Sequence, residues 1–185
     1  MKAAFKEWAI VVDALGRGRQ SLILRKGGIR EGKGGFSVDY DSFLLFPTGF
    51  HQQGASVIGD EQATAARVMG TLSADTIQFT HWATLDSWLE VVSLEQAEKL
   101  QSLHIWSPDV IRSRFDWGRN QGIFALILRV YQLPEPVQIA MLESYGGCKS
   151  WIEVAQDISV DGSKAVLSDA AFSKERQAIE SALNG

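Results

Sequence analysis

The sequence predicts an α+β fold, in which a mixed, partly closed β-barrel-like sheet carries helical insertions and a C-terminal helix. Strand-like segments are scattered through the chain, whereas helix-like segments gather in its middle and at its end. This distribution differs from the regular alternation of strands and helices in a parallel α/β fold. With 185 residues, 45% of them hydrophobic, the chain is long enough to bury the core of one domain.

Strands are predicted where β-branched and aromatic residues are bounded by glycine or proline. Residues 8–14 and 21–24 predict either a hairpin of two strands or a helix followed by a strand. Proline cannot donate to a strand ladder, so Pro47 is expected to stop one strand and Pro134 and Pro136 to close another. The other strands are expected at residues 42–46, 76–92, 124–133, 137–141 and 151–154.

Helices are predicted from apolar spacing and from residues that favour helix ends. Ser93 stands three residues before Gln96, and serine at such a position caps a helix by accepting a backbone hydrogen bond. Ser107 followed by Pro108 marks a second helix start, because proline suits the first helical turn. Two further helices are expected, at residues 60–69 and 170–183.

Composition indicates a soluble protein of the cytoplasm. The longest apolar runs are far shorter than the roughly 18 to 20 residues that a membrane helix needs. Residues 1–14 carry four charged side chains and lack the apolar block of a secretion signal. Cys148 is the only cysteine, so no internal disulfide can form, as expected in a reducing compartment.

The three histidines, His51, His81 and His104, are far apart and show none of the close spacings of metal-binding motifs. We therefore predict no metal site, and the sequence identifies no cofactor. A basic, glycine-rich segment at residues 16–35 is more informative, because it holds six arginine and lysine residues although the whole chain has a net charge of -4.

The centre of this basic segment is a candidate phosphate-binding loop. Two cations stand there beside backbone that no side chain shields, an arrangement suited to phosphate oxygens. The spacing matches neither a P-loop nor a dinucleotide-binding fingerprint, and the alternative is a surface turn with solvated charges. The residues concerned are Arg25, Lys26, Gly27 and Gly28.

Histidine and arginine side chains elsewhere are further candidates. His51 follows a predicted buried strand, where binding side chains are commonly displayed. His104 and Trp106 would share one face of an extended segment. Arg114 lies in a predicted helix with other arginines and Trp117, a composition that can stack a base and neutralise phosphate. In the alternative interpretation, Trp117 packs inward and the arginines pair with neighbouring aspartates.

A short segment at residues 145–151 combines aromatic rings, glycines, a thiol and an ammonium group. A neighbouring lysine can lower a thiol pKa and favour a nucleophile, although a small buried cysteine before a strand is the simpler interpretation. The glycines would let a ligand approach the backbone closely. The candidate ligand-binding residues are Tyr145, Gly146, Gly147, Cys148, Lys149 and Trp151.

Four segments together resemble a bacterial family, the domain-of-unknown-function 1802 family. They are residues 6–29, 43–52, 103–107 and 145–151. The resemblance covers about residues 6–154 and implies a stand-alone or fused bacterial domain with a link to restriction-modification systems. We treat residues 1–185 as a single domain, with a helical extension at about residues 168–184.

A weaker similarity is to the ASCH and PUA-like RNA-binding barrels. It is carried by Ala14, Leu15 and Gly16 followed by residues 20–26, which resemble the helix, turn and basic strand end of those barrels. This similarity implies a nucleic-acid-binding fold and remains an analogy at the level of the fold.

Three functions fit these features. The leading hypothesis is a binding module for nucleic acid or another phosphate-bearing ligand. The second is a metal-dependent nuclease, since Glu31-Gly32-Lys33 matches a carboxylate and lysine pattern of such enzymes and Asp13 is an upstream acidic candidate. The third is a scaffold that contacts only another protein. The first hypothesis assumes that the distant motifs converge on one site.

Overall fold

A computed structural model of the chain describes residues 1–26, 39–49, 54–117, 122–147 and 149–184. Its centre is a seven-stranded sheet in the order β2-β5-β4-β3-β1-β6, with β7 paired to β5. Neighbouring strands run antiparallel except β1 and β3, which are parallel. The strands are β1 (Ala3–Trp8), β2 (Leu22–Arg25), β3 (Ser42–Thr48), β4 (Thr76–Val91), β5 (Ile123–Ala140), β6 (Trp151–Glu153) and β7 (Lys164–Ala165).

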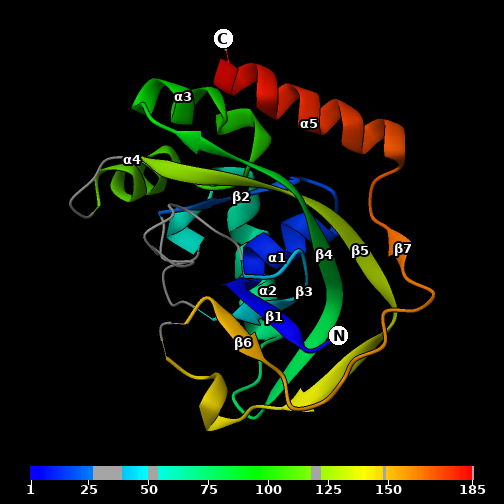
Figure 1. Ribbon diagram of the computed structural model, residues 1–185. Coiled ribbons are helices and arrows are strands. Elements are labelled where there is room, and N and C mark those ends of the chain that lie inside the picture. The colour runs from blue at the N-terminus through cyan, green and yellow to red at the C-terminus, as the bar shows by residue number, and fades with distance from the viewer. Residues whose placement is uncertain (27–38, 50–53, 118–121, 148, 185) are drawn as a thin grey trace.

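The two long strands β4 and β5 give the sheet its strongly curled shape, and helix α1 lies inside the curve (Figure 1). The C-terminal helix α5 packs near α3 across the outer end of these strands. No helix in the described ranges is both long and apolar enough to cross a membrane. The α-helices are α1 (Ala9–Gly16), α2 (Gln62–Gly70), α3 (Leu94–Lys99), α4 (Pro108–Asp116) and α5 (Asp169–Asn184), with short 3-10 turns at Gly54–Ser56, Gly59–Glu61, Gln101–Leu103 and Glu143–Tyr145.

This architecture confirms the predicted α+β class with a partly closed sheet and a C-terminal helix. The helices predicted at residues 60–69 and 170–183 correspond to α2 and α5. The predicted cap of α3 is also present, since Ser93 Oγ accepts a hydrogen bond from the Gln96 backbone N–H at 3.1 Å. Pro108 occupies the first turn of α4.

The alternative of an early hairpin is wrong, and the helix followed by a strand is correct. Residues 9–16 form α1, while β2 pairs with β5 instead of with β1. The apolar run resembles a buried strand because most of α1 is covered by the sheet. Ile10, Val11 and Leu15 are all buried. A helix that is apolar on every side has the same composition as a buried strand.

The prolines do not end their strands, contrary to the prediction. Pro47 lies within β3 opposite Glu7 of β1, beyond residues 42–44 where β3 pairs with β4. Pro134 and Pro136 lie within β5, where the register against β4 shifts between Phe79 and His81. At such an irregularity the missing proline N–H removes no ladder hydrogen bond.

A buried glutamine joins β2 to the segment that precedes α4. The Gln20 side chain accepts a hydrogen bond from the Ile105 N–H at 3.1 Å and donates one to the Leu22 carbonyl at 2.7 Å. Both ends of this amide are therefore used inside the protein, and they hold two segments that are distant in sequence side by side.

We expect Gln20→Leu to destabilise the protein by about 1–3 kcal/mol, because the buried Ile105 N–H loses its partner. Urea unfolding followed by tryptophan fluorescence measures this change. The control is Gln156→Leu at an exposed glutamine, expected to alter stability by less than about 0.5 kcal/mol. Equal effects of the two substitutions would contradict the role of the Gln20 amide.

Candidate functional site

Strands β1 and β2 bring a buried carboxylate and an arginine together near the start of β6. Alternation along β1 places Phe5 and Glu7 on one face of the strand. Glu7 is only 2% exposed, and its Oε2 lies 3.4 Å from the Arg25 guanidinium. Arg25 also donates to Ser150 Oγ at 2.7 Å and stacks 4.9 Å from the centre of the Phe5 ring. This arginine is thus held on three sides.

A second arginine reaches the same place from α4. Ile111 and Phe115 face the core, and the helical spacing turns Arg114 toward the same side. Its guanidinium carbon lies 4.8 Å from the centre of the Trp8 ring and 4.9 Å from that of Trp106. One guanidinium nitrogen donates to a backbone carbonyl, that of residue 24, at 3.0 Å. We call Phe5, Glu7, Trp8, Arg25, Trp106 and Arg114 the arginine–aromatic cluster.

The arginine–aromatic cluster carries more positive than negative charge. Glu7 faces both arginines, and within the described part of the chain no carboxylate forms an ion pair with Arg114. Burial lowers the pKa of Arg114; the Glu7 carboxylate acts in the opposite direction, and Arg25 adds to the lowering. Arginine stays protonated despite such shifts, so the surplus charge persists at neutral pH.

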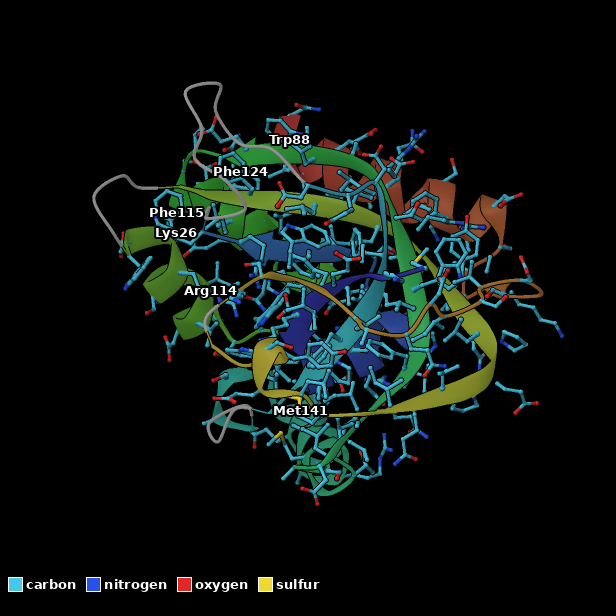
Figure 2. All side chains as sticks on the ribbon, turned by 60° about the horizontal axis from the view of Figure 1, so that its bottom comes forward. Lys26, Trp88, Arg114, Phe115, Phe124 and Met141 are labelled. Carbon is cyan, nitrogen blue, oxygen red and sulfur yellow. The ribbon has the colours of Figure 1, made fainter. Side chains whose placement is uncertain are left out.

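Lys26 borders the cluster and links α4 to the start of β5. Its Nζ donates to the carbonyls of Phe115 at 2.6 Å and Gly122 at 2.9 Å. Desolvation lowers the pKa of Lys26, and the charge of Asp116 opposes this effect. Figure 2 shows Lys26 beside Phe115, with Arg114 on the same side of the molecule.

Trp151 extends the aromatic surface from β6. Its ring packs 4.7 Å from Phe5 and 4.9 Å from Phe43, in edge-to-face geometry. On another side it meets Tyr40 at 5.3 Å, and Tyr40 is 41% exposed. The aromatic residues thus continue from the half-buried arginines to the protein surface.

Several buried polar ring atoms in and beside the cluster have no hydrogen-bond partner among the described residues. His104 is fully buried, and its ring lies 5.4 Å from that of Trp106. Among the residues described, neither nitrogen of His104 nor the indole nitrogens of Trp106 and Trp151 has a hydrogen-bond partner. Burial, with smaller effects of Arg114 and Arg19, lowers the pKa of His104 to about 4. His104 is therefore neutral at pH 7.

The structure brings together five of the residues that the sequence singled out: Arg25, His104, Trp106, Arg114 and Trp151. Four others, Gly27, Gly28, His51 and Cys148, lie outside the described residues. The predicted common face of His104 and Trp106 is confirmed by the contact of their rings.

The segment at residues 145–151 is divided between different surroundings. Tyr145 packs in a separate core group, 6.3 Å from Phe46, and its hydroxyl accepts a hydrogen bond from Ala155 N. The Gly147 carbonyl accepts a hydrogen bond from Lys6 Nζ at 3.2 Å, and its φ of 76° favours glycine. Gly146 adjoins the Glu143 carbonyl, and Lys149 is exposed.

The alternative interpretation of α4, in which Trp117 packs inward, is wrong, whereas base stacking by this segment stays a prediction. Trp117 is 71% exposed, while Arg114 turns inward to Trp8 and Trp106. Arg112 on the outer face pairs with Glu98 at 3.0 Å. The helix places Arg114 and Trp117 on different sides because Trp117 follows the last helical residue with extended backbone.

The residues suggested for nuclease chemistry do not form a group that the structure describes. Asp13 pairs with Arg17 at 2.6 Å and Arg67 at 3.4 Å. Glu31 and Lys33 lie outside the described residues. Within the described ranges, no group of three or more histidine, cysteine, aspartate or glutamate residues is placed to hold a metal ion.

Sequence reasoning missed Phe5, Glu7, Trp8 and Ser150. One signal was present: Glu7 is a charged residue within a largely apolar run, and a buried charge requires a partner. The partner could not be found from the sequence, because Arg25 lies on β2, which is not paired with β1, and the two side chains meet only in the folded sheet.

The family described as Domain of unknown function (DUF1802) matches residues 4–178. The chain belongs to this family. No curated protein and no solved structure matches the DUF1802 chain, so the similarity to ASCH and PUA-like barrels stays an expectation. Three of the segments that carry the family resemblance supply residues of the site. Residues 6–29 supply Glu7 and Arg25, residues 103–107 supply Trp106, and residues 145–151 supply Trp151.

We expect His104 to make stability depend on pH. Its pKa is about 4 in the folded protein and near 6.5 when unfolded, so below pH 6.5 the unfolded state binds a proton first. Between pH 6.5 and 5 the protein should lose about 1.5 kcal/mol of stability from this group alone. Urea unfolding at both pH values measures the loss.

The matched variants are His104→Phe and His104→Gln, which cannot take up this proton. Their stability should fall less than that of the unmodified protein over the same pH interval. Identical pH dependence in all three proteins would show that His104 is not held neutral by burial.

Proposed function

We propose that the DUF1802 chain is a binding module for nucleic acid or a nucleotide, and that the arginine–aromatic cluster holds a phosphate group of this ligand. The observation that carries the proposal is the charge of the cluster, in which Arg25 and Arg114 have Glu7 as their shared acidic neighbour. A buried or half-buried cation is costly without a counter-charge. A phosphate would supply that charge.

The type of cation also supports a phosphate. Guanidinium groups present several N–H donors in a plane and bind phosphate oxygens through paired hydrogen bonds. Trp8 and Trp106 flank the Arg114 plane, so the side chain is already oriented before a ligand binds. Less conformational entropy is then lost on binding.

The aromatic residues supply a surface for a base. Nucleic-acid-binding proteins commonly combine cations for the backbone with aromatic rings for the bases. Trp151 and the partly exposed Tyr40 continue the aromatic surface outward from Arg25. The buried indole nitrogens of Trp106 and Trp151 are donors without partners among the described residues, as expected where a ligand supplies acceptors.

Arg114 offers the sharpest test, because its loss leaves no described carboxylate without an ion-pair partner, whereas loss of Arg25 would isolate Glu7. We expect Arg114→Gln to weaken binding about tenfold and to lower the salt slope of log K by about one. Arg114→Lys keeps the charge but loses the planar group. Fluorescence anisotropy with short single- and double-stranded DNA, RNA and a labelled adenine nucleotide measures both quantities.

Arg112→Gln is the matched control, since Arg112 lies on the same helix and pairs with Glu98 at the surface. It should leave affinity within about twofold of the unmodified protein. Thermal melting confirms that each variant is folded. If only the nucleotide binds, the phosphate belongs to a free nucleotide. If only the oligonucleotides bind, it belongs to a nucleic acid.

Three outcomes would contradict the proposal. No binding to any probe at low salt would point to a protein partner or a different small ligand. Equal weakening by the Arg112 and Arg114 substitutions would place the contact elsewhere. Cleavage of the bound oligonucleotide when magnesium is added would favour a nuclease.

A further inference from the structure

A cavity of about 640 Å³ lies between α1, α2 and the paired strands β4 and β5. None of its described lining residues belongs to the arginine–aromatic cluster. Its size falls within the range of pockets that take small organic ligands. The register of β4 against β5 shifts between Phe79 and His81, and residues on both sides of this shift line the cavity.

The cavity has two unlike walls. Helices α1 and α2, with the turn after α2, contribute apolar side chains such as Val12, Val68 and Leu72 beside charged residues. The opposite wall carries amides and hydroxyls from the two strands, including Gln78, Gln132, Gln138, Thr76 and Thr80. A ligand that fits both walls has one apolar face and an edge rich in hydrogen-bonding groups.

The charged residues that line the cavity are Asp13, Arg17 and Arg67, and Glu61 pairs with Arg17 from outside the lining. Asp13 pairs with Arg17 at 2.6 Å and with Arg67 at 3.4 Å, and Arg17 also pairs with Glu61 at 2.8 Å. Two cations thus face two carboxylates. In contrast to the arginine–aromatic cluster, each charged side chain among the described lining residues already pairs with an opposite charge, which favours a neutral ligand.

His81 projects into this space from β4. Its Nδ1 lies 2.9 Å from Thr80 Oγ1, while among the described residues Nε2 has no hydrogen-bond partner. Gly16 makes room for the ring, because a Cβ atom at that position would stand 2.4 Å from His81 Cε1. Burial lowers the pKa of His81, opposed by the charge of Asp13, so the ring is neutral at pH 7.

We propose that this cavity binds a neutral ring compound that bears several hydroxyl groups, the chemistry shared by nucleosides and small sugars. The apolar helices contact the face of the ring. The glutamine amides and threonine hydroxyls bind its polar edge, and His81 Nε2 makes one further hydrogen bond. Mixed lining of this kind is typical of pockets that orient small polar ligands.

Uridine and maltose are the two probes, and they separate nucleosides from sugars. Isothermal titration measures binding of each to the full chain. In parallel, NMR of the histidine rings reports the site, because the chain has three histidines and a His81→Gln variant identifies the His81 signal. We expect one probe to bind and to shift the His81 ring signals. Absence of binding by both probes would overturn the proposal.

Two variants locate the site. Gly16→Ala pushes the His81 ring aside and should weaken binding about tenfold, the value of one lost hydrogen bond. Gly70→Ala is its matched control, since nothing lies within 4 Å of a Cβ atom there. Gln132→Leu removes one amide from the cavity wall and tests the same site without altering a helix. Its control is Gln156→Leu, at an exposed glutamine. Unchanged affinity in both Gly16→Ala and Gln132→Leu would overturn the assignment.

Binding of a neutral ligand in the cavity is independent of the proposed nucleic-acid function. Gly16→Ala should leave binding of the labelled oligonucleotides unchanged, and Arg114→Gln should leave the uridine or maltose titration unchanged. Loss of both activities in either variant, in a folded protein, would contradict two separate sites.

Discussion

The enclosure of α1 within the curl of β4 and β5 is the constraint on which the rest of the structure depends. The helix buries Ile10, Val11 and Leu15, so the sheet must wrap around it to remove these side chains from water. The two ends of α1 then lie at the two candidate sites. Its start adjoins Glu7 and Trp8 of the cluster, and one side of the helix, from Ala9 to Gly16, lines the cavity with Asp13.

The two sites differ in charge for a structural reason. Near the start of α1, Arg25 and Arg114 arrive from a strand edge and a separate helix and meet Glu7 as their common acidic neighbour. Near its end, Asp13 is an integral part of α1 and pairs with arginines one turn later and on α2. The first arrangement favours an anion, while the second balances itself and leaves amides, hydroxyls and an imidazole to make the contacts.

Much of the fold was predictable from local patterns. The long strand β4, the Ser93 cap and the helices α2, α4 and α5 follow from spacing and capping chemistry that act within a few residues. Errors arose where burial overrode the local signal. Six of the eight residues of α1 are buried, so Asp13 alone gives too weak a polar face to reveal the helix, and a proline can stand within a strand where the ladder is already irregular.

The sequence by itself determined the fold class and the chemical character of several site residues, including Arg25, Trp106 and Arg114. Only the tertiary structure decided which of them meet. Glu7 on β1 meets Arg25 on β2 although the two strands are not paired, and Arg114 packs against the Trp8 and Trp106 rings, which are almost a hundred residues apart in the chain. Residue types and periodicity report local free energies, whereas these contacts depend on the register of distant strands and on the curl that brings them together.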